Sequence, residues 1–469
     1  MGTPKAVPAA LAVYAEKLHS EGKEFKVGLI TGGATGSQVD SALAQAHAVA
    51  FRTPFQSNKE MRNAINAGEV QYYDVHLSQI GQDVRYGFLG DIDVAIVEAS
   101  DITEEGDIVL STSVGISPTL IQVAHKVIIE LNEAHASKLT GMHDIYIPDA
   151  PPYRREIPIY RVNDRAGSIS VRVNPEKVVG VVCTNERDRI AAFTPLNDTT
   201  SRIGQNVADF LLGEYQRGAI PREFLPLQSG VGNIANAVLG ALGADKKLPA
   251  FSMYTEVIQN SVIDLMMQER IRFVAGSSLT LSDDRLDMLY DNIDVMKERV
   301  LLRPQEITNH PEMIRRLGII AVNTALEADI FGNVNSTHVL GSKMMNGIGG
   351  SADFARNAYL SIFTTPSTAK DGLISSIVPH VSHVDSTEHD VRILVTEQGV
   401  ADLRGKSPSQ RARCIIENCA HPDYKELLWD YLKLSEGKGC HTPMSLRNAL
   451  KMHIAFAETG DMRNTKFEM

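Results

Sequence analysis

The chain has 469 residues, a length that exceeds one ordinary hydrophobic core and predicts two domains. Hydrophobic residues make up 43% and charged residues 22%, which is typical of a soluble globular protein. The formal net charge of −11 argues against nucleic acid or an acidic membrane surface as the main partner.

Short β-branched runs alternate with helical patterns in the first part of the chain. Residues 26–30 form an expected strand, followed by the glycine-rich turn 31–36 and a helix. Further strands are expected at 94–97, 127–131 and 178–182, and helices at 58–67 and 118–124. This alternation predicts βαβ units with parallel sheets. The proline- and arginine-rich stretch 148–172 interrupts it as an irregular or hairpin insertion.

The alternation restarts after a long helix expected over 203–217. Strands are expected at 272–275, 318–322, 374–378 and 391–395. Pro408 after Ser407 and Pro422 after His421 predict two helix starts. We therefore expect an α/β fold with two domains, 1–215 and 216–469, and a boundary between 185 and 225.

Neither a leader nor a membrane span is expected. The first residues lack the apolar core of a signal peptide. The uncharged stretch 224–244 contains glycines, a proline and two asparagines, so it predicts a buried loop and helix. Four cysteines without CxxC or metal-ligand spacing predict reduced thiols and a cytoplasmic protein.

Two glycine turns are the strongest functional signals. In the stretch 346–356, three glycines fall within four positions, and a helix-forming run, 352–360, follows. A second turn, 229–236, precedes the helical run 237–242. Such turns expose backbone N–H groups at a helix start, which predicts anion binding.

Between these turns, the sequence Tyr254-Thr-Glu-Val-Ile-Gln-Asn260 predicts a carboxylate at the start of a helix. The alternative is an ordinary helix start, with Thr255 as N-cap and Glu256 favoured by the helix dipole. Together, the turns and the carboxylate suggest chemistry on a carboxylate or thioester carried by a phosphate-bearing group.

Other site classes compete with this interpretation. Both turns match the loose dinucleotide fingerprint, as Gly230-x-Gly232-x-x-Ala235 and Gly347-x-Gly349-x-x-Ala352. That fingerprint needs a hydrophobic strand before the first glycine, and neither preceding segment reads as a good one. Both turns could also be plain strand–helix connections. The histidines have no metal-ligand spacing, and no metal site is expected.

Several motifs together resemble the acetyl-CoA hydrolase/transferase family, a branch of the class I coenzyme A transferases. They are the stretches 229–239, 254–258, 327–335, 341–350, 366–370 and 395–404. The resemblance covers nearly the whole chain, and within the family it is closest to transferases that act on succinyl-CoA and acetate. Such proteins usually have a further strand and loop upstream of residues 2–8, so the first domain is expected to lack a strand.

The resemblance implies two similar open α/β domains with mainly parallel sheets and an active site in the cleft between them. It implies Glu256 as the nucleophile, with Asn309 and Gly350 as further catalytic residues. The implied CoA-binding residues are Gln228, Ser229, Gly230, Val231, Gly232, Asn346, Gly350 and Lys370. A homodimer is usual for the family.

The expected activity is CoA exchange between small acids, with acetate and succinate as the first choice. An ionised Glu256 would attack the thioester without a general base and then carry CoA as a glutamyl thioester. The substrates are CoA thioesters and carboxylates, with no permanently bound cofactor. The alternatives are an acyl-CoA hydrolase on the same scaffold, an NAD-dependent oxidoreductase and a non-catalytic CoA-binding protein.

Overall fold

The computed structural model describes residues 2–33, 37–190, 195–436 and 440–468. The chain divides into two compact units that are interleaved along the sequence. Unit 1 comprises Met1–Ala192, Ala250–Leu317 and Asn346–Asp353, and unit 2 comprises Phe193–Pro249, Gly318–Met345 and Phe354–Met469. The chain thus leaves unit 1 near residue 192 and returns to it twice.

The N-terminal segment of unit 1 alternates helices with mainly parallel strands. Strands β1, β2 and β3 form one parallel sheet in that order, and a second sheet has the order β5-β4-β6-β7 with only β5 antiparallel. The elements are α1 (Ala6–Ser20), β1 (Val27–Gly33), α2 (Ser37–Gln45), β2 (Val49–Phe55), α3 (Lys59–Asn66), β3 (Gln71–Tyr72), α4 (Leu77–Arg85), β4 (Val94–Ile102), β5 (Ile108–Leu110), α5 (Ser117–Val123), β6 (Lys126–Asn132) and β7 (Val178–Thr184).

The second segment of unit 1 adds a parallel set in the order β13-β11-β9 and the parallel pair β10 and β12. Its elements are β9 (Phe251–Tyr254), β10 (Val257–Gln259), α8 (Asn260–Met267), β11 (Ile271–Gly276), β12 (Ser278–Thr280), α9 (Asp283–Asp291), α10 (Ile293–Lys297), β13 (Val300–Leu302), α11 (Gln305–Thr308) and α12 (Pro311–Leu317). Short helix α13 (Ser351–Asn357) starts in unit 1 and ends in unit 2.

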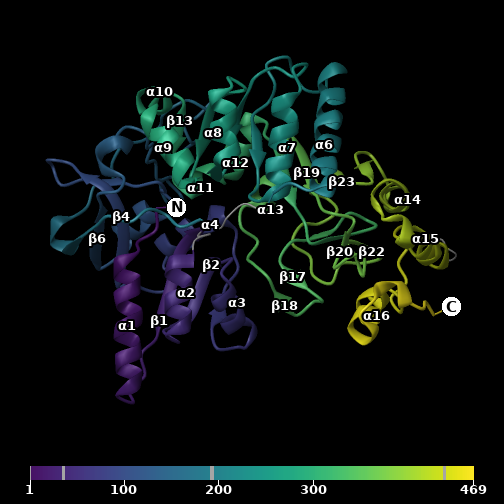
Figure 1. Ribbon diagram of the computed structural model, residues 1–469, viewed down its shortest axis with the longest axis horizontal. Coiled ribbons are helices and arrows are strands. Elements are labelled where there is room, and N and C mark those ends of the chain that lie inside the picture. Colours follow the sequence, from purple (N-terminus) through teal and green to yellow (C-terminus); the bar gives the residue numbers. More distant parts are fainter. Residues whose placement is uncertain (1, 34–36, 191–194, 437–439, 469) are drawn as a thin grey trace. The chain divides into compact units, whose positions relative to one another are not determined.

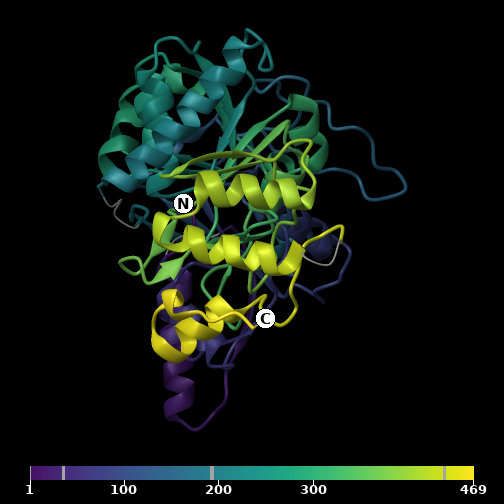
Figure 2. The same cartoon turned by 90° about the vertical axis from the view of Figure 1, so that its right-hand side faces the viewer.

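Unit 2 contains the parallel strands β8-β14-β19-β23, with β24 antiparallel beside β23. Helices α6 and α7 lie side by side (Figure 1), and the yellow helices α14 and α15 lie next to each other in Figure 2. The main elements are α6 (Asp198–Gln216), β8 (Leu227–Ser229), α7 (Asn233–Ala244), β14 (Ile320–Thr324), β19 (Leu360–Thr364), β23 (Ile393–Thr396), β24 (Gly399–Asp402), α14 (Pro408–Cys419), α15 (Pro422–Glu436) and α16 (Lys451–Thr459).

Short strand pairs add to unit 2, and all of those described next are antiparallel except β15 with β22. Strand β15 pairs with both β16 and β22, while β17 pairs with β18 and β20 with β21. The bounds are β15 (Glu327–Asp329), β16 (Val334–Asn335), β17 (His338–Val339), β18 (Lys343–Met344), β20 (Thr368–Ala369), β21 (Ile374–Ser375) and β22 (Ile377–Val378).

The predicted α/β class with mainly parallel sheets is confirmed. Predicted strands coincide with β1, β4, β6, β7, β11, β14 and β23, because runs of β-branched and other aliphatic residues favour strands. Burial varies among them, since Val179 and Val181 of β7 are 56% and 48% exposed. The predicted strand 374–378 is instead two strands, β21 and β22, which pair with different partners. The stretch 148–172 contains no named helix or strand, as expected from its prolines. Positions 34–36 of the predicted turn 31–36 lie outside the described residues.

Helix α1 is fixed at its start by a carboxylate from a distant strand. Its own N-cap residue makes no side-chain capping bond. The buried Glu130 of β6 accepts the N–H groups of Lys5, Ala6 and Val7 at 2.6–3.1 Å. These otherwise unsatisfied donors are therefore capped from outside the helix.

Among the described residues, none of the helices combines the length and the apolar composition needed to cross a bilayer. The uncharged stretch 224–244 forms β8 and α7 instead, and most of its apolar side chains are buried.

Candidate active site

Glu256 lies at a bend between two short strands of unit 1, so the expected helix start is wrong at this residue. Helix α8 begins four positions later, at Asn260, because Val257–Gln259 is buried and pairs in parallel with β12. The carbonyl of Glu256 accepts the N–H groups of Ser277 and Ser278 at 2.7 and 3.2 Å. These bonds hold the bend between β9 and β10 in place.

Gly33 and Gly350 lie against the two oxygens of the Glu256 carboxylate, and we call these two residues the glycine walls. A methyl group built on Gly350 would lie 2.8 Å from Glu256 Oε2, and one built on Gly33 would overlap Oε1. Real Cβ atoms do not approach an oxygen this closely without something shifting. Alanine at either position would therefore force the Glu256 carboxylate to move, and a reacting group has to enter the same space.

The side-chain amide of Asn309 stands beside this carboxylate. Asn309 follows α11 and is fully buried. Neither Nδ2 nor Oδ1 has a hydrogen-bond partner among the described residues. A methyl group on Gly350 would lie 3.3 Å from Asn309 Oδ1. Since buried amides are nearly always hydrogen-bonded, this orphaned group indicates a place for a ligand.

Electrostatics keep Glu256 from ionising easily. Burial raises the pKa of its carboxyl group to about 8, and the negative charge of Asp353 adds to the rise. Glu256 is nevertheless partly exposed, because a cavity of about 740 Å³ inside unit 1 reaches it and Gly33. A pKa raised in this direction leaves the carboxyl group only partly ionised at neutral pH in the ligand-free protein.

The glycine turn 346–350 is held by the chain's own carboxylate. The N–H of Ile348 donates to both oxygens of Asp74, at 2.9 and 3.0 Å. Asn346 is partly exposed, and its Nδ2 donates to the carbonyl of Gly347 at 3.0 Å. Helix α13 after the turn has only seven residues, and the run predicted to continue to 360 ends at Asn357.

The other glycine turn lies in unit 2, and it does follow a strand. The buried strand β8 precedes Gly230, whose N–H donates to the carbonyl of Val322 at 3.1 Å. The prediction that no good strand precedes this turn is wrong, so the missing strand does not count against a dinucleotide fingerprint here. The strand before the turn 346–350 is β18, a two-residue strand that pairs with β17 in an antiparallel hairpin.

The predicted CoA-binding residues of this turn differ in exposure. Val231 is 46% exposed, whereas Gln228 and Ser229 are buried. The Gln228 amide pairs with that of Asn323 at 3.2 and 3.3 Å. Gly232, with φ of +106°, is the N-cap of α7 and offers no side chain to it. The start of this twelve-residue helix is thus open to an anion.

Lys370 belongs to the tight turn between β20 and β21 in unit 2. It is exposed, and its Nζ lies 5.0 Å from the centre of the Phe456 ring. Lys370 and Asp371 both have left-handed backbones, with φ of +50° and +55°. Two consecutive non-glycine residues in this region are costly, so the backbone of this turn is strained.

The predicted residues therefore separate into two groups. Glu256, Asn309, Asn346 and Gly350 belong to unit 1. Within it, Gly350 lies next to both Glu256 and Asn309. Residues 228–232 and Lys370 belong to unit 2. Gly33 was not among the predicted site residues, although the pair of glycines at the end of a predicted strand is a usable signal.

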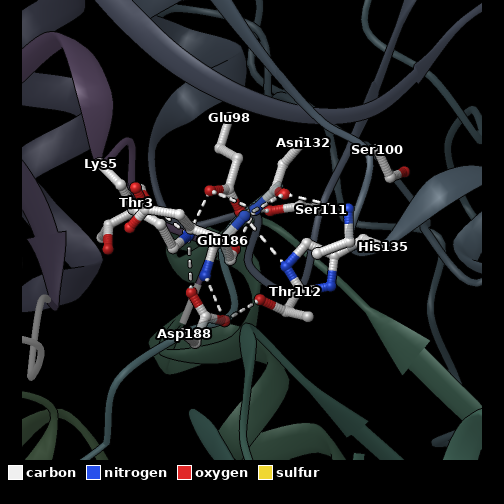
Figure 3. Close-up of polar contacts among 12 residues, drawn as sticks. Thr3, Lys5, Glu98, Ser100, Ser111, Thr112, Asn132, His135, Glu186 and Asp188 are labelled. Carbon is white, nitrogen blue, oxygen red and sulfur yellow. Dashed lines mark hydrogen bonds and ion pairs between the residues drawn. The ribbon is translucent and has the colours of Figure 1, made fainter. Parts of the chain in front are cut away.

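One buried group in unit 1 has metal-like spacing among the described residues: Glu98, His135 and Asp188. Lys5 lies between the carboxylates, with Nζ bonded to Glu98 and 3.0 Å from Asp188 Oδ1 (Figure 3). Burial also lowers the pKa of His135 to about 3. The Lys5 ammonium pairs with both carboxylates and offsets one of their two negative charges, so an ion-pair network already occupies the space between them.

Comparisons with known proteins identify the scaffold. Residues 1–183 match the acetyl-CoA hydrolase/transferase N-terminal domain, and residues 286–432 match the C-terminal domain of the same family. The Yersinia pestis RipA crystal structure is similar in fold, with a TM-score of 0.70 and 23% identity over 92% of each chain. A 4-hydroxybutyrate CoA-transferase from Porphyromonas gingivalis has a TM-score of 0.61 and 22% identity, over 90% of this chain and 96% of that one.

Three curated relatives are much more similar in sequence. The propanoyl-CoA:succinate CoA transferase of Escherichia coli is 49% identical over 98% of this chain and 93% of its own. The succinyl-CoA:acetate CoA-transferase of Clostridium kluyveri is 49% identical over 98% and 85%. The acetyl-CoA hydrolase of Schizosaccharomyces pombe is 46% identical over 99% and 91%.

Proposed function

Because the chain belongs to the acetyl-CoA hydrolase/transferase family, we propose that it is an acyl-CoA:carboxylate CoA-transferase for small acids. Acetate and succinate are the expected pair. One relative at 49% identity is named for propanoyl-CoA and succinate, and the other for succinyl-CoA and acetate. The observation that carries the proposal is the Glu256 carboxylate between Gly33 and Gly350, beside the unpartnered amide of Asn309.

The reaction begins on Glu256. Its ionised carboxylate attacks the thioester carbonyl, which forms an acyl–glutamyl anhydride and releases CoA thiolate. The thiolate then attacks the glutamyl carbonyl, which leaves a glutamyl–CoA thioester and frees the first acid as its carboxylate. The acceptor acid repeats the two steps in reverse order, so that CoA leaves on the acceptor and Glu256 is regenerated.

Each attack places negative charge on a carbonyl oxygen. The Nδ2 group of Asn309 and the N–H groups of the Gly350 turn are the proposed donors to that oxygen in unit 1. Donors of this kind stabilise the transition state because they are already oriented before charge develops.

The CoA carrier is proposed to contact residues 228–232, Asn346, Gly350 and Lys370. The open start of α7 and the Lys370 ammonium suit phosphate groups. No permanently bound cofactor is needed, because CoA enters as a substrate and the covalent chemistry uses a carboxylate.

An acyl-CoA hydrolase is the second candidate, since the Schizosaccharomyces pombe relative is named for that activity. In a hydrolase, water and not a carboxylate would complete the reaction. A site that stabilises an anhydride has to exclude water, which favours the transferase.

Acetyl-CoA consumption with and without succinate tests the proposal. A transferase consumes acetyl-CoA slowly alone, much faster with succinate, and yields succinyl-CoA with ping-pong kinetics. Mass spectrometry of enzyme treated with acyl-CoA is expected to find CoA on the peptide that carries Glu256. Equal rates with and without succinate, with free CoA released, would identify a hydrolase.

We also infer a cytoplasmic homodimer. The dimer is usual for the family, and the four cysteines are all free thiols, which suits a reducing compartment. Light scattering after size-exclusion chromatography measures the mass directly, and a 51.3 kDa species would contradict the dimer.

A further inference from the structure

The glycine turn that walls Glu256 has little intrinsic rigidity. Residues 347–350 include three glycines, and Gly349 has a left-handed φ of +60°. Within the turn, Ser351 Oγ donates to the carbonyl of Ile348 at 2.9 Å. Because glycine-rich backbone is conformationally free, contacts outside the turn have to fix its distance from Glu256.

The first such contact comes from the segment before α4. Asp74 receives the Ile348 N–H on both of its oxygens, at 2.9 and 3.0 Å. The turn lies so close that a methyl group on Gly347 would overlap the Tyr72 hydroxyl and lie 2.9 Å from Asp74 Oδ1. The carboxylate thus holds the turn against the end of β3.

The second contact comes from Asp353, at the other end of the turn. Asp353 is 6% exposed and accepts the N–H of Ser78 at 3.0 Å and its hydroxyl at 2.6 Å. The N-cap residue of α4, His76, makes no capping bond with its own side chain. Asp353 therefore serves as the missing N-cap of α4 and ties the turn to that helix.

The same first turn of α4 also fixes the opposite wall. Gln305 Nε2 donates to the carbonyl of Leu77 at 3.2 Å, and Gln305 Oε1 accepts the N–H of Gly33 at 2.9 Å. Gln305 is buried, and a methyl group on Gly32 would lie 2.8 Å from its Oε1. Hydrogen bonds thus connect both Gly33 and the turn that contains Gly350 to residues 74–78.

We propose that the start of α4, residues 74–78, sets the gap between the two glycine walls, with Asp353, Asp74 and Gln305 as positioning residues. The inference rests on the proposed function, because the gap matters only if Glu256 reacts there. Asp353 is the most informative of the three, since it also brings a second negative charge near Glu256.

The charged groups around Asp353 decide what its removal does. His76 Nδ1 lies 3.8 Å from Asp353 Oδ1, and Arg85, farther along α4, pairs with Glu306 at 2.7 Å. The Asp353 charge acts on Glu256, and burial raises the pKa of Asp353 itself to about 6. Asp353→Asn keeps an acceptor for Ser78 but removes the charge, whereas Asp353→Ala removes both.

The experiment compares Asp353→Ala, Asp353→Asn and the exposed control Glu105→Gln in acetyl-CoA:succinate exchange. Asp353→Ala is expected to lower kcat about 100-fold with acyl-CoA KM within twofold, because an error of about 1 Å costs this much. Asp353→Asn is expected to retain more activity and to shift the acid limb of the kcat/KM profile to lower pH. Glu105→Gln should match the wild type.

A wild-type kcat in folded Asp353→Ala, or an unshifted acid limb in Asp353→Asn, would overturn the proposal. Circular dichroism and the melting temperature report whether the variants fold. If Asp353→Ala does not fold, the position of the acid limb of the kcat/KM profile in Asp353→Asn tests the proposal. If the wild type forms no CoA adduct on Glu256 and exchanges no CoA, the proposed function itself fails. A wild type that forms the adduct, with variants that form it equally fast, refutes only the positioning role.

Discussion

The hydroxyl of Tyr254 donates a 2.7 Å hydrogen bond to the carbonyl of Ile307, and this bond ties the strand before Glu256 to the helix before Asn309. Tyr254 is fully buried, and burial raises the pKa of its hydroxyl, which therefore stays protonated and remains a donor. The nucleophile and the amide beside it are thus linked through backbone two residues away from each.

Tyr254→Phe is expected to lower the free energy of unfolding by about 1–3 kcal/mol, because the Ile307 carbonyl is left buried without this donor. It should also lower kcat more than it raises the acyl-CoA KM. Urea unfolding and steady-state kinetics measure the two effects. An unchanged kcat with reduced stability would limit the bond to a structural role.

Alanine at either glycine wall is expected to abolish most activity in a folded protein. The added methyl group of Gly350→Ala or Gly33→Ala occupies space that the Glu256 carboxylate uses. Gly28→Ala is a matched control in the same strand as Gly33, since its methyl group meets only Phe51 Cδ1 at 3.9 Å. A loss of activity in Gly28→Ala equal to that in Gly33→Ala would show that strand β1, and not the carboxylate, is sensitive.

The rate of adduct formation should rise with pH up to about 8. Glu256 attacks only when ionised, and burial raises the pKa of its carboxyl group to about 8. Below this pH, kcat/KM for acetyl-CoA is expected to fall about tenfold per pH unit. A flat profile between pH 6 and pH 8 would contradict the raised pKa.

The same pKa predicts how stability depends on pH. The folded protein holds the Glu256 proton more tightly than the unfolded chain does. The contribution of Glu256 to the free energy of unfolding therefore decreases as the pH rises from the unfolded pKa to about 8. Glu256→Gln, which cannot ionise, should therefore be more stable than the wild type at pH 9, by on the order of 5 kcal/mol, since each pKa unit of the shift corresponds to about 1.4 kcal/mol. The difference should vanish near pH 4; a difference independent of pH would contradict this account.

Asn309→Ala is expected to lower kcat by about 10²–10³, the usual loss for one oxyanion donor, with little change in CoA affinity. Its buried amide has no partner among the described residues, so the fold should tolerate the change. Steady-state kinetics and the melting temperature check both statements. Normal kcat with a large rise in acyl-CoA KM would make Asn309 a CoA-binding residue instead.

Lys370→Ala is expected to weaken CoA binding, and the loss should shrink as salt rises, because an ionic contact is screened. Lys466→Ala, at an exposed site of the same unit, is the control. Calorimetry at two ionic strengths measures both. Equal affinity in Lys370→Ala and wild type at low salt would leave Lys370 with only its contact to Phe456.

The sequence predicted most of the buried architecture, because β-branched runs and proline-capped helix starts such as Ser407–Pro408 act locally. The error at Glu256 arose because Thr255 and Glu256 fit a helix N-terminus equally well, and only the long-range pairing of β10 with β12 selects a strand. Asp74, Gln305 and Asp353 could not be predicted either. Each acts on a residue more than 200 positions away, and spacing along the chain carries no trace of such a contact.

The interleaving of the two units also constrains biosynthesis. Glu256 and Asn309 are synthesised after unit 2 has begun, and Gly350 is synthesised after all of β14–β18. A nascent chain cannot complete the reaction site until Asp353 has left the ribosome, although N-terminal domains usually fold first. We therefore expect that neither 1–215 nor 216–469 folds stably when expressed alone. Helices α1–α5 are expected to complete their packing only after the later segments of unit 1 have been synthesised.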